Sequence, residues 1–260
     1  MAESTLSFDT YDLRAGVAAD LGWGRDSGKW SDGKLNELKE ITQSGIRQFM
    51  FPPPLRGEAK AHVWSFLRPT FTLTTESGTT EYNLPDNFGG VFGDITYNDS
   101  NNRYSPIRIV GPGEIRKLRQ RLVTVNSAPN RAAIEPLAHD GTKSQRYKLL
   151  VWPDPNAAYD LVVPYFAIQD SPTGASPFPL GGAIHADTLL ASCLSIAEQR
   201  IEGDRGVKWS MFMERLAASV YMDRRVTSPQ NLGYVGDVDR DRRSGSPQFR
   251  TNTITHTGRN

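Results

Sequence analysis

The chain has 260 residues, and its 30 lysines and arginines nearly balance its 29 aspartates and glutamates. The formal net charge of +1 gives no general attraction to nucleic acid or to a membrane surface. Cys193 is the single cysteine, which excludes an intramolecular disulfide framework and a zinc site built from several cysteines. With no long apolar run and no signal-peptide pattern at the N-terminus, we expect a soluble protein that is used without secretion.

Two helices are predicted in the first fifty residues. Residues 9–21 repeat apolar side chains every four positions, and Gly22 follows as a natural C-terminal cap. Residues 32–50 begin after Ser31, a favourable N-cap, and end before Pro52, because the residue preceding a proline avoids the helical region. The second helix has one apolar or small-residue stripe, made of Leu35, Leu38, Ile41, Gly45 and Phe49.

A rigid and aromatic connection follows the second helix. Pro52, Pro53 and Pro54 restrict the backbone and favour a stiff, extended spacer. Trp64 and Phe66 come next, and aromatic side chains on a rigid element serve either as part of a core or as anchors of an interface. We expect these five residues to form a structural hinge that packs against the helices and fixes the angle at which the following region leaves them.

Residues 67–180 have the composition of strands. The runs TFTLTT, GVFGDITYN, SPIRIV, YKLLVWP and YDLVVPYFAI are rich in β-branched and aromatic residues and are separated by Gly, Pro or Asn. The segment VGPGEIRKLRQRLV predicts a short helix, whose arginines indicate a solvated face or a track for phosphates. A β-rich domain is therefore predicted inside a helical protein.

Two further helices are predicted at residues 186–202 and 205–225. The inward residues of the first are Leu189, Leu190, Cys193, Leu194, Ala197 and Ile201. Those of the second are Trp209, Phe212, Leu216 and Val220, with Met213, Ala217 and Tyr221 widening the face. So wide an apolar face indicates that the last helix contacts more than one neighbour, and the short connection between the two helices predicts an antiparallel hairpin.

Together these elements predict an α+β fold with three parts. Residues 1–66 and 181–226 would form a four-helix body, residues 67–180 an inserted β-rich domain, and residues 227–260 an extended C-terminal arm. The arm lacks helical periodicity, and its five arginines against three aspartates make it a poor DNA-binding segment. Its apolar residues are spaced too irregularly for one face of a helix or strand, which suits docking into successive pockets on a partner.

No sequence pattern indicates catalysis or a bound metal. GWGRDSG has the glycines of a phosphate-binding loop but follows a helix rather than a strand. DVDRDRRSGSPQ places three aspartates as in a calcium loop, but Arg242 and Gln248 stand where that loop needs Gly and Glu. Cys193 lies on an apolar stripe and is interpreted as a buried structural thiol. We therefore predict no enzyme activity and no cofactor.

Three motifs resemble the head-to-tail adaptor (connector) proteins of tailed bacteriophages. They are LGWGRDSGKW, SGIRQFMFPPP and HVWSFLRPTFTL, within residues 21–73, and NLGY after the last predicted helix is a weaker match. On this resemblance we expect the partner-binding residues to be Gly22, Trp23, Gly24, Arg25, Trp30, Arg47 and Gln48 of the motifs, with Asn231, Leu232 and Tyr234 around NLGY. From the composition of the arm, which the resemblance does not cover to its end, we add Phe249 and Ile254.

The resemblance implies a structural virion protein of the neck or tail, made in the cytoplasm of a bacterial host. It implies a homo-oligomeric ring docked beneath the dodecameric portal protein, a surface for the tail or nozzle protein, and a channel that genome DNA crosses without specific contacts during ejection. Extended C-terminal arms in such rings bind neighbouring subunits or the portal. A tail-tube or nozzle ring component is the alternative within assembly, and an enzyme or a nucleic-acid-binding module would be alternatives of another class. No membrane partner is implied.

Overall fold

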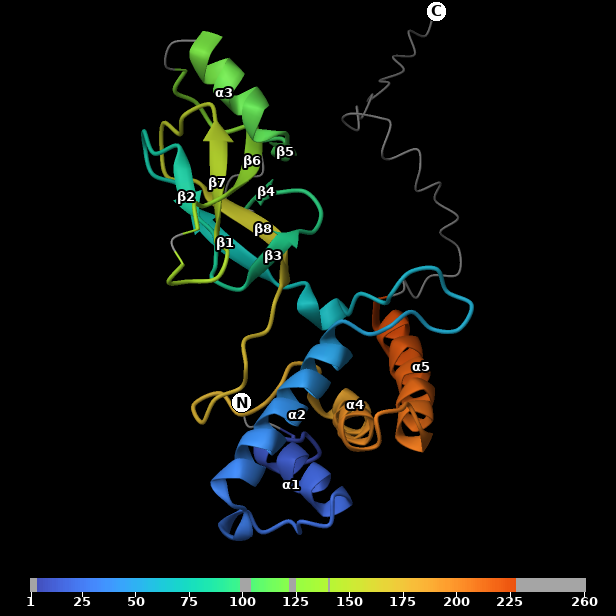
Figure 1. Cartoon of the computed structure of the whole chain (residues 1–260). Coiled ribbons are helices and arrows are strands. Elements are labelled where there is room, and N and C mark those ends of the chain that lie inside the picture. Colours follow the sequence, from blue (N-terminus) through green and yellow to red (C-terminus); the bar gives the residue numbers. More distant parts are fainter. Residues whose placement is uncertain (1–3, 99–103, 122–124, 140, 228–260) are drawn as a thin grey trace, which may run out of the picture. The chain divides into compact units, whose positions relative to one another are not determined.

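The computed structural model describes residues 4–98, 104–121, 125–139 and 141–227. Within these ranges the chain forms five α-helices and two four-stranded sheets, which is an α+β fold (Figure 1). The expected docking residues of the arm, Asn231, Leu232, Tyr234, Phe249 and Ile254, lie outside the described residues.

Helices α1 (Thr10–Asp20) and α2 (Asp32–Met50) both begin with side-chain caps. Asp9 and Asp12 form a capping box: the Asp12 amide donates to Asp9 Oδ1 at 2.8 Å, and the Asp9 amide donates to Asp12 Oδ2 at 3.2 Å. Ser31 Oγ accepts a hydrogen bond from the third backbone amide of α2. The predicted N-cap and bounds of α2 are confirmed, because local signals mark both of its ends.

Helices α4 (Gly182–Glu202) and α5 (Val207–Thr227) form the second pair. Compared with the prediction, α4 begins at residue 182 rather than 186, and α5 at 207 rather than 205. Glu198 fixes the start of α5, because its carboxylate accepts the backbone amides of Gly206, Lys208 and Trp209 at 3.0–3.1 Å. At the other end Thr188 Oγ1 lies 2.6 Å from Ser219 Oγ, so the two helices run antiparallel as expected.

Three residues that were expected to face inward are exposed. Ile201 is 58% exposed and Tyr221 64% exposed, and Ala217 is exposed as well. Ile201 lies in the last turn of α4, beyond the side chain that holds the start of α5. Tyr221 and Ala217 lie away from the side of α5 that buries Phe212 and Leu216. The wide apolar face of α5 is thus covered on one side within the described chain.

The side chains of α1, α2, α4 and α5 share buried clusters. One cluster includes, in chain order, Leu13, Phe49, Leu189, Phe212 and Leu216. Another joins α1, α2 and α4 through Val17, Ile41 and Cys193. Where α2 meets α4 the backbones lie very close, since a Cβ added to Gly45 would stand 2.6 Å from both Cα and Sγ of Cys193. Glycine at this position permits that approach.

The strands form two sheets. In the first, β8 (Asp160–Ala167) pairs with β1 (Thr70–Thr74) on one edge and with β3 (Phe88–Val91) and β4 (Thr96–Tyr97) on the other. The second has the order β2 (Glu81–Asn83), β7 (Tyr147–Trp152), β6 (Arg131–Pro136) and β5 (Arg108–Ile109). All of these pairs are antiparallel except β5 with β6. Strands β2 and β6 were not predicted from the sequence.

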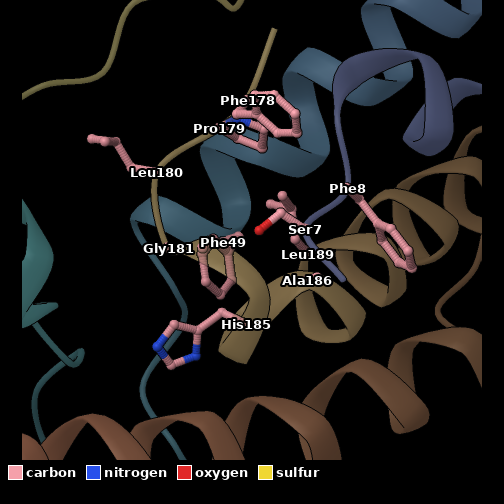
Figure 2. Close-up of a pocket in the computed structure, with 11 residues that line it drawn as sticks. Ser7, Phe8, Phe49, Phe178, Pro179, Leu180, Gly181, His185, Ala186 and Leu189 are labelled. Carbon is pink, nitrogen blue, oxygen red and sulfur yellow. The ribbon is translucent and has the colours of Figure 1, made fainter. Parts of the chain in front are cut away.

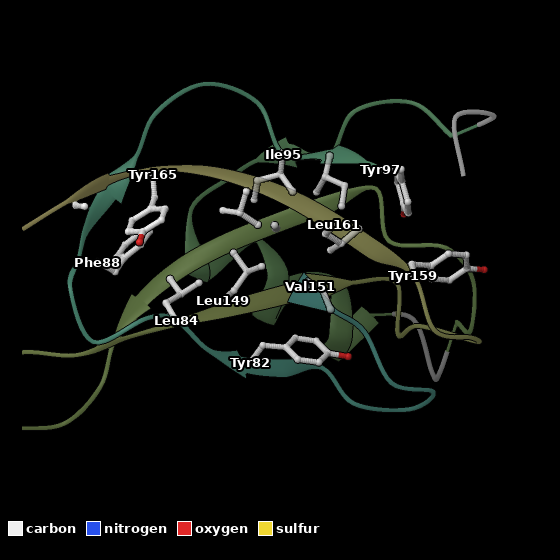
Figure 3. Close-up of a cluster of buried hydrophobic side chains, with 14 residues drawn as sticks. Tyr82, Leu84, Phe88, Ile95, Tyr97, Leu149, Val151, Tyr159, Leu161 and Tyr165 are labelled. Carbon is white, nitrogen blue, oxygen red and sulfur yellow. The ribbon is translucent and has the colours of Figure 1, made fainter. Parts of the chain in front are cut away.

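The two sheets share one apolar core (Figure 3). Every second residue of β8 is buried, the pattern of a strand with one face inward. From the first sheet the core takes Leu161, Val163 and Tyr165, and from the second Tyr82, Leu149 and Val151. Helix α3 (Pro112–Arg121), which was predicted as a short helix, packs Ile115 against Ala133 of β6 and Leu150 of β7.

Candidate partner-binding surfaces

The glycine turn, residues 21–30, links α1 to α2. Gly22 and Gly24 have φ values of +73° and +75°, in the left-handed region that favours glycine. The amide of Trp23 donates to a carbonyl oxygen of α1 at 2.7 Å, and the indole N–H of Trp30 donates to the Gly24 carbonyl oxygen at 3.0 Å. The turn is therefore internally braced, and the buried side chain of Trp30 belongs to the core.

The outer side of the glycine turn presents Arg25 and part of Trp23. Arg25 is exposed, and its carbonyl oxygen accepts a hydrogen bond from the Tyr11 hydroxyl at 3.3 Å. The ammonium of Lys34 lies 5.2 Å from the centroid of the Trp23 ring, a cation–π contact. Of the predicted partner-binding residues in this motif, Arg25 and Trp23 have side chains that a partner can touch, and the neighbouring Asp26 and Lys29 are exposed as well.

Arg47 and Gln48 lie on different sides of α2. The Gln48 amide donates to Ser195 Oγ of α4 at 3.2 Å, so this side chain is engaged within its own chain. Arg47 is exposed and lines a cavity of about 220 Å³ together with Phe51 and Ile168. The structure therefore leaves Arg47 available to a partner and uses Gln48 for packing.

The expected hinge residues gather at the C-terminal end of α2. Trp64 is completely buried, and its indole N–H donates to the carbonyl oxygen of Phe49 at 2.7 Å. Its ring centroid lies 4.8 Å from that of Phe49, 5.4 Å from that of Phe66 and 5.1 Å from that of His185. Trp64 is thus part of the core of its own chain. Along the prolines, exposure increases from the buried Pro52 to the exposed Pro54.

A polar latch ties the segment after the prolines to the C-terminal part of α5. The carboxylate of Asp223 accepts hydrogen bonds from the amide and hydroxyl of Ser65, and His62 Nε2 lies 2.7 Å from it. Beside it, the guanidinium of Arg224 donates two hydrogen bonds of 2.8 Å to Glu58. The segment from Glu58 to Ser65 is therefore held against α5 at both of its ends.

The electrostatics of the latch favour a charged carboxylate. Burial alone would raise the pKa of Asp223, but the hydrogen bonds from Ser65 and His62 outweigh it and hold the pKa below its ordinary value. Although Ser, His and Asp meet here, Ser65 and His62 both contact Asp223, with no hydrogen bond recorded between them. His62 is therefore not positioned to accept a proton from Ser65, and the geometry of the latch is that of a structural contact.

A hollow lies beside α4, close to these residues (Figure 2). It has a volume of about 260 Å³, and we call it the α4 hollow; its lining includes Phe8, Phe49, Phe178, Leu180, His185 and Leu189. His185 is 6% exposed, and its Nδ1 has no hydrogen-bond partner among the described residues. Burial lowers the pKa of His185, which favours the neutral imidazole.

The roles of Asp223 and His185 were not predicted from the sequence. A signal for Asp223 was present, since it falls three residues after Val220 and seven after Leu216 on the buried stripe of α5. A carboxylate on such a stripe requires partners. Its partner His62 lies 161 positions away in the sequence, so no local spacing could identify it. The α4 hollow is likewise formed by three separate segments.

Chemistry typical of an active centre is not evident in the described ranges. They contain no group of three or more His, Cys, Asp or Glu placed to hold a metal ion. Burial raises the pKa of the Cys193 thiol to about 12, so the thiol stays protonated and unreactive. Among the described helices, none is both long and apolar enough to cross a membrane.

Two of the four basic residues of α3 are engaged by the neighbouring strands. Arg116 pairs with Glu135, and Arg119 donates to the carbonyl oxygens of Thr80 and Val151 at 3.1 and 3.2 Å. Lys117 and Arg121 are exposed. The contacts of Arg116 and Arg119 lower the charge that α3 offers to a polyanion, which favours a solvated face over a phosphate track.

The described chain thus combines braced turns, a buried aromatic cluster and exposed apolar side chains. The sequence profile of the SU10 adaptor protein family matches residues 11–233, most of the chain. The chain therefore belongs to the SU10 adaptor protein family of tailed-bacteriophage head-to-tail adaptors. The family places the protein in the neck of the virion. No curated protein with which the sequence was compared matches it.

Proposed function

We propose that the protein forms a ring beneath the portal, extends the DNA channel and provides the surface to which the tail attaches. The family match over residues 11–233 is the observation that carries this proposal. A near-neutral chain suits a channel wall that DNA must cross without being held, because strong neutralisation of phosphates would retain it.

Three parts would share this work. The helical body, residues 1–66 and 181–226, would pack side by side around the ring, and the β-rich domain, residues 67–180, would project from it. Separate apolar clusters support this division, since one set draws on the helices and another on the two sheets. Pro52–Pro54, Trp64 and Phe66 would set the angle between the two parts, because Trp64 is anchored to Phe49 just before the chain enters β1.

The C-terminal arm, residues 227–260, would dock on the portal or on neighbouring adaptor subunits. Its sequence combines low apolar content with scattered large side chains, including Leu232, Tyr234 and Phe249. A segment that becomes ordered on binding contributes affinity when its partner is present and little before.

A reconstitution experiment tests the proposed ring. Purified protein would be mixed with the portal of the same phage, and the complex would be sized by sedimentation and imaged by electron microscopy. The proposal predicts one ring of this protein on the portal, coaxial with its channel. Binding to a tail tube in place of the portal would instead support the alternative tail-tube or nozzle component.

A further inference from the structure

Helix α5 is apolar on two opposite sides. Its inner side buries Phe212, Leu216 and Val220 in the helical cluster. Its outer side carries Val207, which is 72% exposed, and Tyr221, together with further apolar residues. We call this outer surface the α5 ridge; it consists of Val207, Met211, Ala218, Tyr221 and Met222. The exposed Glu214 also lies on this outer side, but several large apolar side chains exposed together on one helix are typical of a surface that another protein covers.

Tyr221 of the α5 ridge points away from α4, whereas Met211 and Met222 lie on the same stripe of the helix as Arg215, which contacts Asp187 of α4. Tyr221 and Ser219 are two positions apart, which places them about 200° apart on a helix of 3.6 residues per turn. Ser219 contacts Thr188 of α4, with the two hydroxyl oxygens 2.6 Å apart. Tyr221 therefore faces the opposite direction, outward from the helical pair.

The α4 hollow opens on the other side of the same pair. Ala186 lines the hollow and Thr188 contacts α5, and these two positions are again about 200° apart. In Figure 2 the segments that carry Phe8 and Phe178 lie across the hollow from α5, the reddish-brown helix. Tyr221 and the hollow thus lie on different sides of one α4–α5 hairpin, so they can form a head-to-tail contact, which joins two different surfaces of identical subunits.

The chemistry of the two surfaces is complementary. Most of the side chains that line the hollow are apolar. The buried His185 is polar, and its unpaired Nδ1 can form one hydrogen bond. Among the described tyrosines, Tyr11 and Tyr221 have exposed side chains, and the hydroxyl of Tyr11 is already bound to the Arg25 carbonyl. Tyr221 supplies an aromatic ring with a hydroxyl, the combination that a hollow of this kind accommodates.

Charged residues of opposite sign lie near the two surfaces, and the ridge side of α5 also carries Glu214. Arg225 is exposed and lies one turn beyond Tyr221 on the ridge side of α5. Asp9 and Asp12 lie at the start of α1, directly after Phe8 of the hollow. Opposite charges at the edge of a contact orient two subunits as they meet.

We propose that the α5 ridge of one copy packs against the α4 hollow of a second copy, with the Tyr221 ring inside the hollow and its hydroxyl bonded to His185. The contact is heterologous, so repetition of it generates a ring when the rotation closes. This inference rests on the proposed ring and identifies the surfaces between its subunits.

Cysteine cross-linking tests the pairing. The native Cys193 is buried and would not react with a short bismaleimide. Any cross-link must therefore join the newly introduced cysteines. Tyr221→Cys and Leu180→Cys would be made separately, and the assembled rings would be treated with the reagent. We expect no cross-link in either variant alone, a dimer when the two variants are mixed, and a ladder of multimers when one chain carries both.

Three cross-linking results would overturn the pairing. Dimers from Tyr221→Cys alone would mean that the ridge packs on itself. A cross-link from Leu180→Cys to Tyr234→Cys would mean that the hollow receives the arm. Rings that form without any cross-link between positions 221 and 180 would contradict the inference and leave the proposed ring intact. A wild-type protein that forms no ring would overturn both.

A series of substitutions separates an effect on ring assembly from an effect on the stability of the monomer. Tyr221→Glu should leave the melting temperature of the monomer unchanged, because the side chain is exposed, and should lower ring yield at least tenfold. Val125→Glu, an apolar-to-acid change at an exposed position of the β-rich region, is the matched control and should assemble normally. Tyr221→Phe, which removes the hydroxyl and keeps the ring, should weaken assembly less than Tyr221→Glu. Equal ring yields for Tyr221→Glu and wild type would refute the role of the ridge.

Discussion

Replacement of Gly45 by alanine tests how closely α2 and α4 are packed. The new Cβ would stand 2.6 Å from Cys193 Cα and Sγ and 2.9 Å from its backbone nitrogen. Because two of these obstructing atoms are backbone, no rotation of a side chain can relieve the overlap, and α2 and α4 must separate. Overpacking of this kind typically costs about 1–3 kcal/mol.

Helix propensity acts in the opposite direction. Alanine in place of glycine inside a helix stabilises it by roughly 0.5–1 kcal/mol. The overlap should exceed this gain, leaving Gly45→Ala less stable than wild type by about 1 kcal/mol. For a folded unit of this size that corresponds to a melting temperature lower by about 2–4 °C.

Gly33→Ala is the matched control on the same helix. A Cβ at Gly33 meets no atom within 4 Å, so this variant should be at least as stable as wild type. Thermal melts of the two variants, followed by circular dichroism at one protein concentration, provide the comparison. If Gly45→Ala melts as high as Gly33→Ala, the close approach of α2 and α4 described above is wrong.

Three further predictions concern Trp64, Asp223 and the arm. Trp64→Ala should destabilise the protein by about 3–5 kcal/mol in urea unfolding, since it empties a fully buried site; unchanged stability with lost assembly would place this residue at an interface instead. Because the folded-state pKa of Asp223 is lowered, its contribution is complete above the unfolded value of about 4 and is lost as the pH falls through the folded value. The stability difference between wild type and Asp223→Asn should therefore be largest near pH 7 and shrink below about pH 4, and a constant difference would contradict the latch. Deletion of residues 228–260 should leave the melting temperature nearly unchanged and abolish retention on the portal; an unfolded product, or normal retention, would exclude a docking arm.

Local signals explain which elements could be predicted. Ser31 and Pro52 mark the two ends of α2, and β8 could be found from its run of β-branched and aromatic residues, although its alternating burial is not visible in that run. Strand β6 could not be found in this way, because its alanines favour helix as much as strand and its order comes from pairing along the whole length of β7. Strand β2 spans three residues, too few for a pattern to appear.

The motifs of the candidate surfaces could be predicted from the sequence, but the three-dimensional arrangement of their side chains could not. The glycine turn and the Pro–Trp segment could be found from their residue types, yet burial of Trp30 and Trp64 depends on helices distant in sequence. The apolar width of α5 predicted more than one neighbour, but sequence could not show that Ala217 and Tyr221 stay uncovered within the described chain. Which side of α5 is uncovered becomes known only from the packing of α4 against α5.

The mass of the portal complex tests the central claim most directly. The purified protein would be measured alone and after addition to the portal ring of the same phage, by mass photometry or native mass spectrometry. The adaptor account predicts a single new species in which the portal has gained one copy of this protein for each of its subunits. A portal ring whose mass is unchanged at saturating protein would contradict the account.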